Sequence, residues 1–266
     1  MPGLPGAHDV AVDRHPAASD AAHLNFVGSY RRLVRHAHGA KVREFGSVFA
    51  FTTGVPVGIF NGCIVAARPI DADLEAALDW LAGLDLPFYL WAEEDVAAGI
   101  SGMAASRSLE PGAWLVPHMV LDAVTEPPPP RAGITVRTVT DPTTLESFRQ
   151  ILVADGLPLD ASRRLFPDTF LADTDVRVIL ADLDGRPVGT AVAIRTGDVA
   201  GVYAVATLER VRRRGVGTAA TWAAVAAGRA WGCRVVTLQS SRMGFGVYEA
   251  MGFRTVASFV IFRRPS

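Results

Sequence analysis

The stretch Val202-Tyr-Ala-Val-Ala-Thr-Leu-Glu-Arg-Val-Arg-Arg-Arg-Gly-Val-Gly-Thr218 decides the fold of this chain. It opens with an apolar run typical of a buried strand, passes through a short basic turn and enters an Ala-rich helix that we expect to end near Trp231. Gly215 and Gly217 have no Cβ, so the backbone of the turn can approach a ligand closely. A strand, a glycine turn and a helix N-terminus in this order predict an α/β fold with an anion site.

Backbone amides and arginine side chains are the anion-binding groups expected in this turn. The start of a helix offers unpaired N–H groups and the positive end of the helix dipole. The basic residues beside the turn are Arg210, Arg212, Arg213 and Arg214. The amides expected to converge on an anion belong to Arg213, Arg214, Gly215, Val216, Gly217 and Thr218, and Thr218 adds a hydroxyl. Together these groups predict a cradle for phosphate.

Other interpretations of the same glycines stay open at this point. A Walker loop requires a Gly-Lys-Ser/Thr ending, which the chain does not contain. A dinucleotide fingerprint requires a third small residue and an acidic residue about 20 positions on, and that acidic residue is missing. An ordinary helix entry with a solvated arginine face is the third alternative.

The second half of the chain alternates between strands and helices. Asp141 and Pro142 predict a helix start, because Asp is a good N-cap and Pro suits the first turn. Asp184-Gly185 predicts a hairpin turn. The strands are expected at residues 134–139, 176–183, 188–194, 199–206, 233–238 and 253–262, and the helices at 142–154, 161–171, from the glycine turn to about 231, and 246–251. This order predicts a mixed α/β sheet.

A run of four prolines, 127–130, divides the chain into halves, because it favours an extended linker. In the first half, helices are expected at 25–36, 71–82 and 93–103, and strands within 47–65 and at 88–91 and 114–121. The division is then a disordered leader at 1–20, a first domain at 21–125, a linker at 126–133 and a second domain at 134–266.

The composition of the 266 residues excludes several classes of protein. The 26 basic and 27 acidic residues give a net charge of −1, which argues against a nucleic-acid-binding protein. Cys63 and Cys233 are expected to be buried thiols, and no Cys/His spacing predicts a metal site. The uncharged stretch 45–67 is long enough to span a membrane, but its glycines and proline favour two buried strands. With no signal-peptide pattern at the start, the expected location is the cytoplasm, away from membranes.

Three patterns in the second half resemble the GNAT superfamily of N-acetyltransferases. Arg212-x-x-Gly215-x-Gly217, after a strand and before an Ala-rich helix, resembles motif A of that superfamily. The strand 235–241 followed by Val247-Tyr-Glu-Ala-Met-Gly-Phe253 resembles the next motif, and 186–194 is similar to the third strand. The resemblance covers about 134–264 and implies acetyl-CoA, or another acyl-CoA, as the donor.

The implied fold class is α/β, with a mixed, mostly antiparallel sheet flanked by helices, the acyl-CoA N-acyltransferase fold. The first half resembles a second, degenerate copy, which implies two such domains in tandem. No Gly-x-Gly occurs before residue 127, so the first half lacks the cradle. Its expected roles are to shape the acceptor cleft or to form a homodimer.

The resemblance also implies roles for individual residues. The fourth strand splays from the fifth, and the backbone of Val205, Ala206 and Thr207 pairs with the pantetheine arm of the cofactor, with the Val205 N–H polarising the thioester carbonyl. Tyr248 corresponds to the acid that protonates the leaving thiolate. Candidate bases are Glu209, Asp198 or a water chain, with His118 a weaker candidate.

The implied reaction is direct attack by a primary amine of a small molecule or peptide. Gln239, Ser240 and Ser241 stand where many members carry Asn, and Ser241 is the candidate to hold the pantetheine. Met243, Gly244 and Phe245 form an apolar entrance, which favours an uncharged substrate region. A non-catalytic acyl-CoA sensor and a different nucleotide-binding domain are the alternatives.

Overall fold

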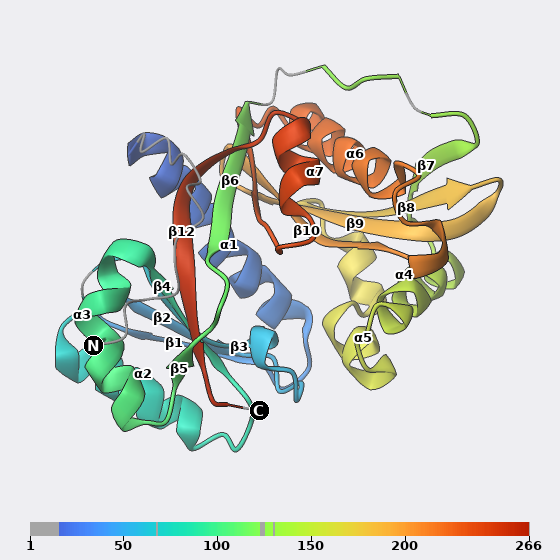
Figure 1. Ribbon diagram of the computed structural model, residues 1–266. Helices are drawn as coiled ribbons and strands as arrows, with labels where there is room; N and C mark the ends of the chain where they lie inside the picture. The colour runs from blue at the N-terminus through green and yellow to red at the C-terminus, as the bar shows by residue number, and fades with distance from the viewer. Residues whose placement is uncertain (1–15, 68, 123–125, 130, 266) are drawn as a thin grey trace.

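A single sheet of twelve strands runs through the computed structural model, which describes residues 16–67, 69–122, 126–129 and 131–265 (Figure 1). Eleven strands follow the order β1-β2-β3-β4-β12-β6-β11-β10-β9-β8-β7, and β5 pairs with β12. The strands are β1 Lys41–Phe45, β2 Val48–Thr52, β3 Asn61–Val65, β4 Tyr89–Glu93, β5 Glu110–Pro111, β6 Val116–Asp122, β7 Ile134–Thr138, β8 Val176–Leu183, β9 Arg186–Thr196, β10 Val199–Thr207, β11 Val235–Gln239 and β12 Arg254–Arg263.

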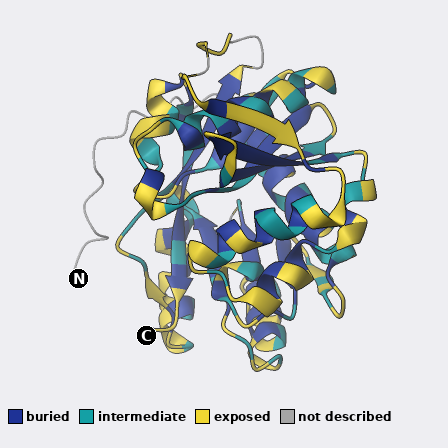
Figure 2. Ribbon diagram, turned by 90° about the vertical axis from the view of Figure 1, so that its right-hand side faces the viewer, coloured by how far each residue is buried: buried dark blue, intermediate teal, exposed yellow. Residues whose placement is uncertain are grey.

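Helices cover both faces of this sheet. The α-helices are α1 Pro16–His36, α2 Asp71–Ala82, α3 Glu94–Ser106, α4 Pro142–Ala154, α5 Leu159–Leu165, α6 Val216–Ala230 and α7 Phe245–Ala250. Short 3-10 helices are η1 Gly58–Phe60, η2 Asp168–Ala172 and η3 Glu209–Val211. The strands are largely buried, and the helices alternate between buried and exposed residues (Figure 2). No helix among the described residues is long and apolar enough to cross a membrane.

Strands β6 and β12 each pair with strands from the other half of the chain. We call β1–β5 with α2 and α3 the first lobe, and β7–β11 with α4–α7 the second lobe. Strand β6, from the first half, lies between β11 and β12 and pairs antiparallel with both. Strand β12, the last of the chain, pairs antiparallel with β4 of the first lobe. The sequence predicts two domains in tandem, and in the structure the two halves of the chain share one sheet.

The apolar core of each lobe also contains residues of a strand from the other half of the chain. Met119 and Leu121 of β6 belong to the core of the second lobe, under α6. Val260 and Phe262 of β12 belong to the core of the first lobe, under α2 and α3. Each lobe therefore completes its core with a strand from the other half of the chain, and neither core is built from contiguous sequence.

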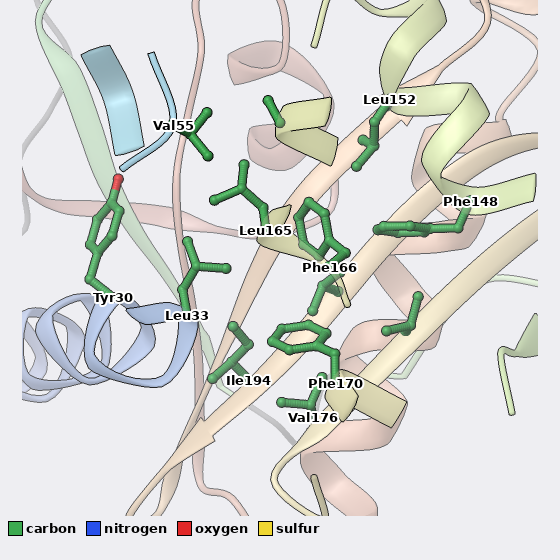
Figure 3. Packing of buried hydrophobic residues seen from close by; sticks show 14 of the residues in the cluster. Tyr30, Leu33, Val55, Phe148, Leu152, Leu165, Phe166, Phe170, Val176 and Ile194 are labelled. Carbon is green, nitrogen blue, oxygen red and sulfur yellow. The ribbon is translucent and has the colours of Figure 1, made fainter. Parts of the chain in front are cut away.

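Helix α1 joins the lobes through a third core. Its residues Tyr30 and Leu33 pack in one cluster with Phe166 and Phe170 of the second half and Val55 of the first (Figure 3). Further bonds fix α1 to the second lobe: the Asn25 side-chain amide donates to the Ile194 and Val199 carbonyls at 3.1 and 3.0 Å. Arg32 bridges Asp173 and Asp175 at 2.6 and 2.7 Å.

The two lobes repeat one order of strands and helices. Strands β1, β2 and β3 are antiparallel neighbours, and β3 is parallel to β4, with α2 connecting that parallel pair. Strands β8, β9 and β10 are likewise antiparallel, and β10 is parallel to β11, with α6 as the connection. Helix α6 thus stands in the second lobe where α2 stands in the first.

Most elements lie where the sequence predicts them. Helix α4 begins as expected, since the Asp141 carboxylate accepts a hydrogen bond from the Thr144 amide at 2.9 Å. Asp184 and Gly185 both have positive φ, as the hairpin prediction requires. The helix expected at 161–171, with an irregularity around Pro167, is α5 followed by η2, and Pro167 lies between them.

Two elements of the first half differ from what the sequence predicts. Helix α1 begins at Pro16, so residues 16–20 are helical although the leader 1–20 was expected to be disordered; residues 1–15 lie outside the described residues. Strand β1 was not expected, because Lys41–Phe45 is charged and mostly exposed at the edge of the sheet. Of the expected linker 126–133, residue 130 lies outside the described residues.

Candidate functional site

Strand β10 diverges from β11 along most of its own length. They pair in parallel only where Val199, Ala200 and Gly201 lie opposite Val235, Val236 and Thr237. Beyond Gly201, β10 continues to Thr207 against β9 alone, while β11 continues against β6. The edge of β10 from Val202 to Thr207 therefore has no strand partner on the β11 side, and its backbone groups on that edge are available to a ligand.

A bulge lies in the middle of this free edge. The register with β9 shifts between Tyr203 and Ala206, and Ala204 takes a positive φ of 50°. The Thr190 hydroxyl of β9 spans the bulge, donating to the Ala204 carbonyl at 2.8 Å and accepting from the Ala206 amide at 3.2 Å. Val205, expected to contact the thioester, has no partner in either strand register.

The glycine turn begins directly after β10 and η3. Arg213 and Gly215 take positive φ values of 63° and 91°, and Gly215 is the N-cap of α6. The first amide of the helix to bond within it is Ala219, which donates to the Gly215 carbonyl at 3.0 Å. The preceding amides, those of Val216, Gly217 and Thr218, therefore have no acceptor within the helix, and they form the donor set that the sequence predicts for an anion.

The helix approaches β10 closely at Gly217. A Cβ added to Gly217 would lie 3.3 Å from the Thr207 hydroxyl oxygen, which is a tight contact. The absence of a side chain here lets the turn lie directly at the end of the free β10 edge. The gap and the turn are therefore continuous, as a ligand with an anionic end and an extended arm would require.

The arginines of the turn play different structural parts. Arg212 donates to the Thr207 carbonyl at 3.3 Å and to Asp155 at 3.0 Å, so it ties the turn to β10 and to the end of α4. Arg214 lies 3.9 Å from Asp184, and Arg213 is exposed. Arg212 thus has two partners within the protein, and its contact with an anion stays a prediction.

A further cation beside the turn was not predicted from the sequence. The Arg131 side chain lies against Gly215, with its Cδ and Nε 2.9 and 3.1 Å from the position that a Cβ on Gly215 would occupy. Arg131 ends the proline segment, 84 residues before Gly215 (215 − 131), so no local pattern connects the two. The only available signal was its position directly after the prolines.

Ser241 lies in the turn before α7, and Tyr248 lies within that helix. The Ser241 hydroxyl accepts from the Gly244 amide at 3.2 Å, so this side chain caps the turn before α7. The Tyr248 ring lies edge-on to Phe253 with centroids 5.9 Å apart and packs against the core of the second lobe. Burial raises the pKa of Tyr248 to about 12, which keeps the phenol protonated at neutral pH.

The candidate bases are dispersed. Glu209 lies exposed in η3, between the end of β10 and the turn. Asp198 lies at the other end of β10. Because the strand has nine residues, that end is roughly 25 Å from Thr207. Asp198 accepts from Arg234 at 2.8 Å, and that hydrogen bond, with the charge of Arg234, lowers the pKa of Asp198. The structure therefore places Asp198 away from the gap.

His118 is buried on β6, opposite Gln239 of β11. Its Nε2 lies 2.8 Å from the Gln239 side-chain nitrogen. Burial, with a smaller contribution from His23, lowers the pKa of His118 to about 3, so the imidazole is neutral at neutral pH. Within the described parts of the chain, no group of three or more His, Cys, Asp or Glu side chains is arranged to hold a metal ion.

Comparison with known proteins identifies the class to which this site belongs. Residues 145–253 match the model of the acetyltransferase (GNAT) family, a segment that runs from α4 to the start of β12 and contains the gap and the glycine turn. The segment is less than half of the chain, and it lies within the second half. The first lobe lies outside the match.

Solved structures with the same fold cover nearly the whole chain. A GCN5-related N-acetyltransferase from Kribbella flavida is 20% identical, with a TM-score of 0.68 over 94% of this chain and 96% of that one. A GCN5-related N-acetyltransferase from Sphaerobacter thermophilus is 16% identical, with a TM-score of 0.58 over 95% and 96%. A tandem GNAT protein from the clavulanic acid biosynthesis pathway is 14% identical, with a TM-score of 0.56 over 92% and 97%. At these identities the likeness concerns the fold. No curated protein matches the sequence.

Proposed function

We propose that this protein transfers an acetyl group from acetyl-CoA to a primary amine of a small molecule or peptide. The observation that carries the proposal is the free edge of β10, which opens between β10 and β11 and leads directly into the glycine turn of α6. The match of residues 145–253 to the GNAT family supports it.

In this proposal the turn holds the pyrophosphate and the gap holds the pantetheine arm. The amides of 213–218 and the α6 N-terminus bind the pyrophosphate, and the backbone of 205–207 pairs with the pantetheine amides. Arg131 and Arg213 add positive charge beside the turn, while Arg212 keeps the turn in place. Ser241 contributes by shaping the turn before α7.

The residues of the gap then act on the reacting groups. The Val205 N–H stabilises negative charge on the thioester oxygen while the amine attacks directly. Tyr248 gives a proton to the leaving thiolate, a role that its raised pKa permits at neutral pH. Of the carboxylates considered, Glu209 lies nearest in sequence to the end of β10, and it serves as base directly or through water. Most of the rate enhancement comes from orientation and electrostatics.

Thiol release from acetyl-CoA tests the proposal. The purified protein should release coenzyme A from acetyl-CoA in the presence of at least one member of a panel of primary amines, with equimolar acetylated amine detected by mass spectrometry. Binding of NADH or ATP in preference to acetyl-CoA would contradict the proposal and favour a different nucleotide-binding protein.

A non-catalytic acyl-CoA sensor is the second candidate, and the dispersed bases favour it. Glu209 is exposed, Asp198 is distant and paired, and His118 is buried. Tyr248→Phe separates the two candidates. For an enzyme we expect kcat to fall about 100-fold or more, because the thiolate loses its acid, while the Kd of acetyl-CoA is unchanged. If the wild type and Tyr248→Phe both bind acetyl-CoA but show equal, negligible turnover, the result would favour the sensor.

A further inference from the structure

At the bulge in β10, the side chain of Thr190 supplies hydrogen bonds in place of the regular backbone pairing with β9. From Tyr203 to Ala206 the chain advances three residues, while the opposite strand advances two, from Val192 to Thr190. The extra residue breaks the regular hydrogen bonds between the strands. The Thr190 hydroxyl replaces them, because it bonds the Ala204 carbonyl at 2.8 Å and the Ala206 amide at 3.2 Å.

These two bonds determine the direction of the Val205 N–H. In a trans peptide the carbonyl of one residue and the amide of the next point in opposite directions, and the chain has no cis peptide among its described residues. The Ala204 carbonyl points to Thr190 on β9, so the Val205 N–H points away from β9. On that side lies the gap between β10 and β11.

The conformation held in this way is one that alanine avoids. Ala204 has a φ of 50°, in the left-handed region that is unfavourable for residues with a Cβ. Thr190 is fully buried, so its hydroxyl has no water to bond instead. Loss of the hydroxyl would leave the Ala204 carbonyl and Ala206 amide without this partner and free the peptide to rotate.

We propose that Thr190 is a positioning residue for catalysis: through its two bonds it fixes the bulge of β10 and aims the Val205 N–H into the gap. The inference rests on the proposed function, in which that N–H meets the thioester oxygen. Thr190 itself touches neither reactant. Its effect falls on the transition state, where charge on the oxygen is greatest, and much less on cofactor binding.

The test compares three variants of the full chain. Thr190→Val keeps the shape and removes the hydroxyl, Thr190→Ser keeps the hydroxyl, and Thr237→Val is the matched control. Thr237 is also fully buried, and its hydroxyl also donates to a backbone carbonyl, that of Met119, at 3.0 Å. The readouts are kcat, the Kd of acetyl-CoA, and hydrogen exchange of the Val205 and Ala206 amides.

We expect Thr190→Val to lower kcat about 10- to 100-fold, somewhat less than complete removal of an oxyanion donor. The Kd of acetyl-CoA should change less than threefold, and exchange of the Ala206 amide should accelerate. Thr190→Ser should restore kcat and the slow exchange. Thr237→Val should leave both unchanged. If the valine variant does not fold, Thr190→Ala offers the same comparison with Thr190→Ser.

Two results would overturn the inference: equal kcat values for Thr190→Val and Thr237→Val, or unchanged Ala206 exchange in Thr190→Val. A failure of the proposed function looks different. In that case the wild-type protein itself would not release thiol, and amide exchange would still decide whether Thr190 holds the bulge.

Discussion

The parallel strand pairs of the two lobes differ in how far they stay together. In the first lobe, β3 pairs with β4 at four consecutive positions, from Gly62 to Val65, so four of its five residues are covered. In the second lobe, β10 pairs with β11 at three of nine residues. The same topology is therefore closed in one lobe and open in the other, and only the open pair leaves backbone free for a ligand.

The helices that connect these strand pairs differ in charge. Helix α2 carries Asp71 and Asp73 in its first turn and begins after Ile70 with an extended backbone. Helix α6 has no acidic residue in its first turn and begins after Gly215, beside Arg131 and three arginines of the turn. Carboxylates at a helix N-terminus repel an anionic ligand, whereas amides and arginines attract it.

Topology alone therefore does not make the site. The first lobe has the strand order of the second but neither its gap nor its basic turn. The first half of the chain also supplies β6 and the packing face of α1, which lie against the second lobe. We therefore infer one cofactor site per chain, in the second lobe, and a first lobe that completes the structure around it.

The largest effect is expected from the strand that both lobes share. Phe259 of β12 is fully buried and contacts the rings of Phe26, Trp91 and His118. Phe259→Ala should lower the free energy of unfolding by about 3–5 kcal/mol, because it removes a large core side chain. Hydrogen exchange should show both lobes losing protection together, since one core spans them.

Val136→Ala is the control for this experiment, because Val136 is 43% exposed on the edge strand β7. Its effect should stay within about 0.5 kcal/mol. Loss of protection in β1–β4 alone, with β8–β10 unaffected, would show that the lobes are independent units.

A smaller effect, on the affinity for acetyl-CoA, is expected at Arg131. This residue lies at the N-terminus of α6, which we compare with the N-terminus of α2. Arg131→Ala should raise the Kd of acetyl-CoA about tenfold, the ~1.4 kcal/mol of a lost charge-assisted contact. Arg264→Ala, which removes an exposed cation at the C-terminal end, is the matched control and should leave the Kd unchanged. Equal affinities for the wild type and Arg131→Ala would exclude Arg131 from the site.

A further effect concerns the pH dependence of stability at the junction between the lobes. Burial, with Asp95 and Asp20, raises the pKa of Glu93 from 4.5 to about 7. From pH 4.5 to 7 the folded state binds a proton that the unfolded state lacks, so this group lowers stability as the pH rises. The pKa of His118 is lowered from 6.5 to about 3. Between these two pH values the unfolded state binds a proton that the folded state lacks, so this group lowers stability as the pH falls.

The two contributions oppose each other between pH 4.5 and 6.5. Glu93→Gln removes one of them, so its stability should fall with acid by about 1 kcal/mol per pH unit relative to the wild type. Denaturant unfolding between pH 4.5 and 6.5 measures this slope. Glu75→Gln, at an exposed position on α2, should keep the wild-type slope. An unchanged slope in Glu93→Gln would show that Glu93 does not hold its proton in the folded protein.

Local patterns were sufficient to predict much of the second lobe. The bounds of β8 coincide with the expected strand 176–183, and α4 and the hairpin at Asp184 follow from cap and turn residues. Helix α2, at 71–82, was also predicted residue for residue. These elements are determined by apolar periodicity and by residues within a few positions of their ends.

Features that depend on distant residues could not be predicted. The insertion of β6 between β11 and β12 depends on which partner completes each core, and no local pattern encodes this choice. Arg131 meets Gly215 only after the chain has folded. Thr190 looks like any strand threonine until the bulge of β10 lies opposite it. The glycine turn could be predicted from the sequence, because its glycines and arginines are contiguous.

Calorimetric titration with acetyl-CoA of the wild type, Gly217→Glu and Ala72→Glu tests whether the cofactor binds in the second lobe alone. Gly217 and Ala72 occupy the same second position of α6 and α2, so the two variants place one carboxylate at equivalent points of the two lobes. We predict one site per wild-type chain, binding weakened at least ~100-fold (~2.7 kcal/mol) in Gly217→Glu, and unchanged binding in Ala72→Glu. Two sites per chain, or weakening by Ala72→Glu with Gly217→Glu still folded and binding, would contradict the account.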